Sequence, residues 1–316
     1  QLSSHKHYDH NHFTIFKKGF LAVDSGARAY PSNHLSHYYC RTAAHNCILI
    51  RMPGEQMPRN YWGEPTPAPE ETERSIPNDG GQREQQGSAV VAFETTPHYS
   101  YAAGDATDTY HQEKCEQALR QFIYIPPDHF VVFDRVRATE PEYKKTWLLH
   151  TAHEPTVEDE TVTAVHENGR LYSRTLLPMT ADMTAVGGSD AQFIADDRNW
   201  ALPDDHEYPE ENPLYGQWRV EVSPQTPARE DYFLHLLQAS DRSERRMVDT
   251  ELLENGDHFG VGFQSDGIRW EISFRTTGDA SGCVKCIDRD GDGEVLVDQT
   301  LTQSVQPQSG LFSYKS

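Results

Sequence analysis

Histidines gather near the start of this 316-residue chain in a pattern suited to binding a metal ion or moving a proton. Four of them lie in the run from His5 to His12, and Asp9 stands among them. If this run is extended, alternate side chains share a face, so His5 and His7 lie apart from His12. Imidazole and carboxylate groups brought to one place are typical of metal sites and of general acid–base catalysis.

Two further residues can complete such a site. Asp24 ends a β-hairpin predicted over 13–23, where two apolar runs flank a short glycine-containing turn. His45 precedes a strand predicted over 46–52. If successive strands pair, His7 joins Asp24 and His45 as neighbours, giving two imidazoles and one carboxylate with an open coordination position. Buried, hydrogen-bonded histidines without a metal are the alternative.

Short strand-like stretches separated by turns recur along the rest of the chain. Their spacing, with 33 aromatic residues, favours an all-β fold, a large antiparallel β-sandwich (a super-sandwich) with a small C-terminal β-sheet domain. We place the sandwich at 1–240 and the small domain at 241–316. One stretch, 109–120, is compatible with a helix. The predicted later strands are 89–95, 121–125, 130–136, 146–150, 171–176, 218–222, 232–238, 259–263, 269–274 and 295–297.

Charge restricts the partners of the chain. The net charge of −21 argues against nucleic acid, because phosphate binding needs a basic face. Residues 1–60 carry seven Lys and Arg against three acids, a balance of +4 that leaves −25 for the rest. The histidine-rich end is therefore the part of the chain that would attract an anionic substrate. No run of about 18 apolar residues is present, so we expect no membrane span.

Two motifs near the C-terminus have a structural explanation. Cys283 and Cys286 have the CxxC spacing, but residues three apart on a strand face opposite ways. The odd count of five cysteines gives no disulfide framework. Asp288 begins a run that mimics a calcium loop, yet the twelfth position is Gln299 instead of Glu. We expect a hairpin turn there.

Seven stretches form an ordered set of motifs: 5–13, 19–26, 41–46, 101–107, 120–124, 131–136 and 145–150. Each motif alone is weak, and their order along the chain makes the set specific. Together they resemble the heparinase II/III-like domain of polysaccharide lyases. The similarity is densest over about 5–155 and thins afterwards.

The resemblance implies a β-sandwich that follows a helical (α/α) toroid, with the active-site cleft between them. It implies that His7, Asp24 and His45 are zinc ligands and that His5 is a catalytic histidine. In the family, the toroid supplies the tyrosine acid/base, a further histidine and an asparagine. No part of these 316 residues resembles the toroid. We therefore expect a fragment, or a chain whose toroid is a separate polypeptide, and we expect it to be inactive in isolation.

The implied activity is cleavage of a uronic-acid-containing polysaccharide by β-elimination, in a bacterial protein of the periplasm or the extracellular space. Three residues between Asp24 and His45 are candidate substrate contacts. Tyr38 and Tyr39 offer rings that could line the cleft, with ordinary aromatic packing as the alternative. Arg41 offers a guanidinium that could pair with a carboxylate or a sulfate.

Two other functions stay open at this point. A cupin-like metal enzyme also uses His-x-His followed by a later histidine, although position 11 is Asn where that fold carries Glu. It predicts a compact barrel that holds iron or manganese. A non-catalytic carbohydrate-binding or structural module, in which the histidines only hold a metal, is the second alternative.

Overall fold

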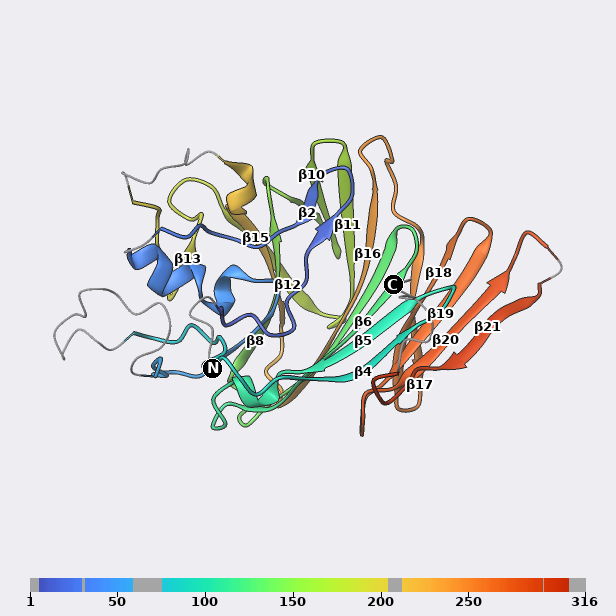
Figure 1. Ribbon diagram of the computed structural model, residues 1–316, viewed down its shortest axis with the longest axis horizontal. Helices are drawn as coiled ribbons and strands as arrows, with labels where there is room; N and C mark the ends of the chain where they lie inside the picture. The colour runs from blue at the N-terminus through green and yellow to red at the C-terminus, as the bar shows by residue number, and fades with distance from the viewer. Residues whose placement is uncertain (1–5, 30–31, 59–75, 204–211, 292, 307–316) are drawn as a thin grey trace, which may run out of the picture.

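A computed structural model describes residues 6–29, 32–58, 76–203, 212–291 and 293–306 of the chain. Three antiparallel sheets of four, eight and five strands lie one against the next, as Figure 1 shows. The predicted all-β antiparallel sandwich is confirmed. The open strand order of the large sheets does not fit the compact barrel of the cupin alternative.

The eight-stranded sheet is the central layer, and its neighbours pair antiparallel throughout. Its middle strands are long and buried over most of their length, as expected for strands covered on both faces. In spatial order the strands are β4 (Ala89–Thr95), β5 (Ser100–Asp105), β6 (Cys115–Ile125), β7 (His129–Ala138), β16 (Glu230–Asp241), β11 (Gly169–Leu177), β10 (Thr161–His166) and β9 (Thr156–Glu158).

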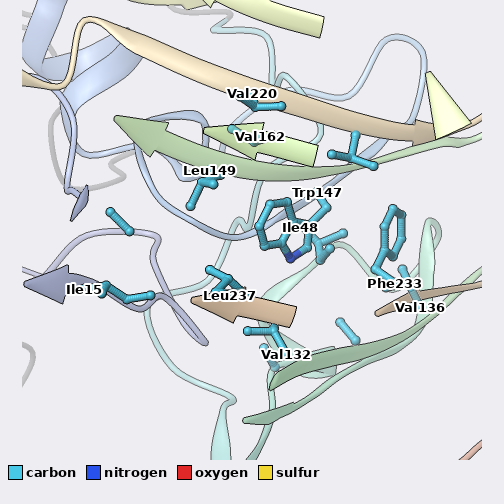
Figure 2. Close-up of a cluster of buried hydrophobic side chains, with 14 of the residues drawn as sticks. Ile15, Ile48, Val132, Val136, Trp147, Leu149, Val162, Val220, Phe233 and Leu237 are labelled. Carbon is cyan, nitrogen blue, oxygen red and sulfur yellow. The ribbon is translucent and has the colours of Figure 1, made fainter. Parts of the chain in front are cut away.

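The four-stranded sheet covers one face of this layer. Trp147 is completely buried between the two sheets and stacks on His235 of β16 with ring centroids 3.8 Å apart. Figure 2 shows Trp147 among Ile48, Leu149 and Phe233, which come from both sheets. The strands of this sheet are β12 (Ala181–Gly187), β15 (Trp218–Pro224), β8 (Lys144–Thr151) and β3 (Ile48–Arg51).

The C-terminal sheet covers the opposite face of the central layer. Phe133 of β7 stacks on Phe274 with centroids 5.0 Å apart, and Gln121 donates to the carbonyl of Ser281 at 3.0 Å. The part of the chain after residue 241 thus shares a hydrophobic core with the central sheet. Its strands are β17 (Thr250–Asn255), β18 (His258–Ser265), β19 (Ile268–Arg275), β20 (Gly282–Asp288) and β21 (Val295–Thr300).

Short elements join these layers. The predicted N-terminal hairpin is confirmed, since β1 (Ile15–Phe16) pairs antiparallel with β2 (Phe20–Ala22). The remaining elements are η1 (Leu35–Tyr39), η2 (Thr42–Ala44), η3 (Thr107–Thr109), β13 (Ile194–Ala195), β14 (Arg198–Asn199) and η4 (Pro213–Tyr215). Among the described residues, no helix is both long and apolar enough to cross a bilayer.

The predicted helix over 109–120 is wrong. η3 ends at Thr109, and β6 begins at Cys115 and pairs with β5 on one side and β7 on the other. A helix in this place would leave the facing backbone groups of both strands without partners, which costs more than the local sequence preference is worth.

The two C-terminal motifs behave as predicted. Cys283 is exposed while Cys286 is buried, and both thiols are free. β20 and β21 pair as a hairpin, and a carboxylate oxygen of Asp288 accepts the backbone N–H groups of Asp290 and Gly291. The described part of the acidic run, up to Gly291, therefore builds a turn.

His129 makes the contact between the central and C-terminal sheets sensitive to pH. Its side chain is buried against the ring of Phe263, with centroids 5.0 Å apart, and its Nε2 has no hydrogen-bond partner among the described residues. Burial lowers the pKa of His129 to about 4, against the attraction of Asp128 and Asp266. Between about pH 4 and 6.5, His129 is therefore neutral in the folded protein and protonated in the unfolded chain.

We expect this histidine to stabilise the fold fully above about pH 6.5 and to lose that contribution as the pH falls toward 4, because only the unfolded state binds the proton there. His129→Phe should reduce the acid-induced fall in the free energy of unfolding by on the order of 3 kcal/mol over this range. Urea unfolding at several pH values measures it. His98→Phe, at an exposed position, is the control, and equal acid sensitivity of both variants would contradict the expectation.

Candidate metal centre

The structure brings together the three side chains that the sequence marks as metal ligands. Ligand atoms of His7, Asp24 and His45 all lie within 4.8 Å of one another. His45 is completely buried and His7 half-buried, while the Asp24 side chain is 46% exposed. His45 Nδ1 lies 2.5 Å from a carboxylate oxygen of Asp24, and its ring centroid lies 5.2 Å from that of His7. Two imidazoles and one carboxylate thus face a common point that is open to solvent on the Asp24 side.

Loops, and not paired strands, position these ligands. The expected pairing of successive strands stops at β1 and β2, because β3 pairs with β8 of the four-stranded sheet. Backbone hydrogen bonds between loops replace it, from Tyr8 N–H to the carbonyl of Cys40 and from Ser25 N–H to the carbonyl of Ala44, each 3.0 Å. These two bonds hold the three ligand-bearing segments side by side.

His12 belongs to this centre, contrary to the prediction from strand alternation. Residues 6–14 form no strand, and Asn11 has a φ of +66°, which turns the chain between His10 and His12. The His12 ring lies edge-on to His45 with centroids 5.2 Å apart. An asparagine between two histidines was the signal for this turn, because Asn tolerates left-handed backbone better than most residues.

The electrostatics of the centre favour ionised Asp24 beside neutral His12. Loss of water around the Asp24 carboxylate raises its pKa, but attraction and a hydrogen bond from His45, with smaller effects of His12 and His7, lower it to about 2. Burial, followed by repulsion from His45, lowers the pKa of His12 to about 4. Metal ligands must be deprotonated, so this arrangement suits cation binding at neutral pH.

The three predicted substrate contacts lie at different depths. Tyr39 is half-buried, and its ring meets that of His7 edge-on with centroids 4.6 Å apart. Tyr38 is 1% exposed, and its hydroxyl shares a 2.8 Å hydrogen bond with Ser25 Oγ. Arg41 is 4% exposed and donates to Asn78 Oδ1 at 3.1 Å. Tyr39 therefore borders the centre, whereas Tyr38 and Arg41 support the loops behind it. The predicted catalytic residue His5 lies outside the described residues.

Asp24 should remain ionised at pH 4 in the metal-free chain, with its carboxylate held by His45. His45→Gln removes the imidazole that carries the attraction, so the pKa of Asp24 should rise to about 4 or above. NMR titration of the side-chain carboxyl carbon measures both values. His153→Gln, outside this centre, should leave Asp24 unchanged. An Asp24 that titrates alike in all three proteins would show that His45 does not hold it.

Comparisons with known proteins agree with this picture. Residues 1–213 match the family model described as "Heparinase II/III-like, C-terminal". The heparan sulfate lyase HepC from Pedobacter heparinus shares 12% identity and a TM-score of 0.57, over 87% of this chain and 38% of that one. A heparinase III gene product shares 11% identity and a TM-score of 0.58, over 85% and 36%. No curated protein matches the chain.

At these identities the solved structures show a shared fold, and the chain spans 36–38% of their length. The family model shows more than a shared fold, because it matches well over half of the 316 residues, and the matched part includes all three clustered ligands. The chain belongs to the heparinase II/III-like C-terminal family.

Proposed function

We propose that this chain is the β-sandwich part of a polysaccharide lyase that cleaves a uronic-acid-containing polysaccharide by β-elimination. The observation that carries the proposal is the cluster of His7, Asp24 and His45 in a chain of this family. The structural neighbours are named heparan sulfate lyase and heparinase III, and these names support an acidic glycan as the substrate class.

We further propose Zn²⁺ as the metal of the centre. The residues fit this ion, since two imidazoles and one carboxylate are a donor set that zinc takes while keeping a fourth position open. His45 Nδ1 already lies 2.5 Å from a carboxylate oxygen of Asp24, so two of these donor atoms are brought together for a cation. When bound, the ion would supply positive charge and hold the loops of the cleft wall together.

β-Elimination at a uronate requires the protein to stabilise negative charge and to transfer protons. The proton at C5 of a uronate is weakly acidic until the charge of the neighbouring carboxylate is neutralised, so a histidine or another donor must stabilise the enolate-like intermediate. A base then takes the proton while an acid protonates the oxygen that leaves C4. We assign His5 to this site, as the base or as the group that binds the carboxylate.

The surroundings of the centre suit an anionic sugar chain locally. Tyr39 offers a partly exposed ring next to His7, where a sugar could pack. The balance of +4 over residues 1–60 attracts a polyanion to this end, while the rest of the chain repels it. Arg41 and Tyr38 act on the substrate through the loops that they support.

The proposed partner in catalysis is an N-terminal helical toroid, in the same or a separate chain. It would close the second wall of the cleft and supply the tyrosine acid/base. That the chain spans 36–38% of its structural neighbours is consistent with such a partner. We propose the periplasm or the extracellular space as the location, where polysaccharide substrates are met.

Elemental analysis of the purified chain should find about one zinc per molecule. His7→Ala and Asp24→Ala should each abolish it, because two ligands do not retain the ion. His153→Ala, which removes a histidine outside the cluster, should keep full occupancy. Iron or manganese in place of zinc, or a metal-free wild type, would contradict the zinc proposal.

Activity requires both walls of the cleft, so we expect unsaturated uronate from the sandwich combined with its toroid and none from this chain alone. Ultraviolet absorbance of the products, tested on several acidic glycans, is the measurement. His5→Ala should reduce kcat by about 10²- to 10⁴-fold, the usual effect of a general acid or base. Glycan binding without turnover in the full assembly would favour the non-catalytic module instead.

A further inference from the structure

Asn46 touches all three loops that carry the metal ligands. Its side chain is completely buried, and its Nδ2 donates to the carbonyls of Phe13 at 2.8 Å and Val23 at 3.1 Å. Its Oδ1 accepts the backbone N–H of His150 in β8 at 2.6 Å. Its own backbone N–H donates to Nδ1 of His12 at 2.8 Å. One amide side chain therefore connects two loops and a strand, and its backbone continues the third loop.

The positions of these contacts along the chain matter for the centre. The carbonyl of Val23 belongs to the peptide bond that enters Asp24, and Asn46 itself follows His45 directly. The carbonyl of Phe13 ends the segment that carries His7 and His12. A shift of Asn46 would therefore change the spacing of all three ligands together.

A buried arginine fastens the same residue to the central sheet. Arg120 Nη1 donates to the carbonyl of Asn46 at 2.6 Å and to that of Asn11 at 2.7 Å. Its remaining nitrogens form a bidentate pair with Asp134 at 2.7 and 3.0 Å, and the two residues face each other across β6 and β7. Both residues are at most 4% exposed. The guanidinium thus fixes two loop carbonyls relative to a rigid sheet.

We propose that Asn46, held by the Arg120–Asp134 pair, is the positioning residue of the metal centre and sets its affinity for Zn²⁺. This inference rests on the proposed zinc site and goes beyond it, because Asn46, Arg120 and Asp134 are not among the proposed ligands. A hydrogen-bonded outer shell that orients ligands typically changes metal affinity by about 10- to 100-fold when it is lost. Loop ligands depend on such support, since no strand ladder holds them.

The test is zinc affinity by competition with a chromophoric chelator. Asn46→Leu keeps the size of the side chain and removes all its hydrogen bonds, and it should weaken zinc binding by about 10- to 100-fold. Gln121→Met is the matched control: Gln121 is equally buried and donates to Tyr101 and Ser281, on the face that meets the C-terminal sheet. It should lower the thermal midpoint of the metal-free chain and leave zinc affinity unchanged.

A milder pair of variants covers the case in which Asn46→Leu does not fold. Arg120→Lys keeps a cation beside Asp134 but lacks the fork that reaches both carbonyls. Arg135→Lys is its control, a buried arginine on the C-terminal side that donates to the carbonyl of Gly278 at 2.8 Å. We expect only Arg120→Lys to weaken zinc binding and to alter the visible spectrum of the Co²⁺-loaded chain, which reports ligand geometry.

Wild-type zinc affinity in Asn46→Leu or Arg120→Lys would overturn the inference while leaving the zinc site standing. Equal loss of affinity in the control variants would also overturn it, because general destabilisation would then explain the effect. A wild-type chain that binds no zinc would overturn both the site and its positioning. Selective loss, with an altered Co²⁺ spectrum and an intact fold by circular dichroism, supports it.

Discussion

The buried ion pair between Arg120 and Asp134 is the interaction on which the candidate site depends. Two charges taken out of water are tolerated only when they are paired and their remaining donors are used. Here Asp134 accepts from Nε and Nη2 of the guanidinium, and the carbonyls of Asn11 and Asn46 accept from Nη1. The same bonds satisfy loop carbonyls that have no place in a strand ladder. The hydrogen bonds that compensate the buried charge of Arg120 are thus the same ones that order the loops.

The layered architecture makes this anchor rigid. The central sheet has a hydrophobic core on each face, one shared with the four-stranded sheet and one with the C-terminal sheet. Strands β6 and β7 cannot shift toward either side without opening a cavity, which close-packed interiors resist. The ligand loops lie toward one end of the molecule and the C-terminal sheet at the other, as Figure 1 shows. The C-terminal sheet therefore serves the site indirectly, by fixing the sheet that carries Arg120.

Much of the fold could be predicted because strand signals are local. Apolar and aromatic residues mark β4 and the N-terminal hairpin, and the Asp-rich turn after Asp288 is readable from its turn chemistry. The helix predicted over 109–120 is wrong because these residues tolerate a helix, and only the pairing of β6 with β5 and β7 favours a strand. The prediction that separates His12 from His7 is wrong for a similar reason, since one left-handed residue at Asn11 interrupts the alternation of an extended run.

The sequence by itself determined the all-β class, the positions of most strands and the identity of His7, Asp24 and His45 as one set. The alternation of apolar and polar residues and the spacing of motifs involve residues close together in the chain, so the sequence alone reveals them. Only the tertiary structure decided that His12 joins the centre, that Tyr38 and Arg41 are buried behind it, and that the C-terminal sheet shares a core. Those outcomes depend on hydrogen bonds and packing between residues far apart in the chain, such as Gln121 and Ser281, which are 160 positions apart. No local pattern encodes such contacts.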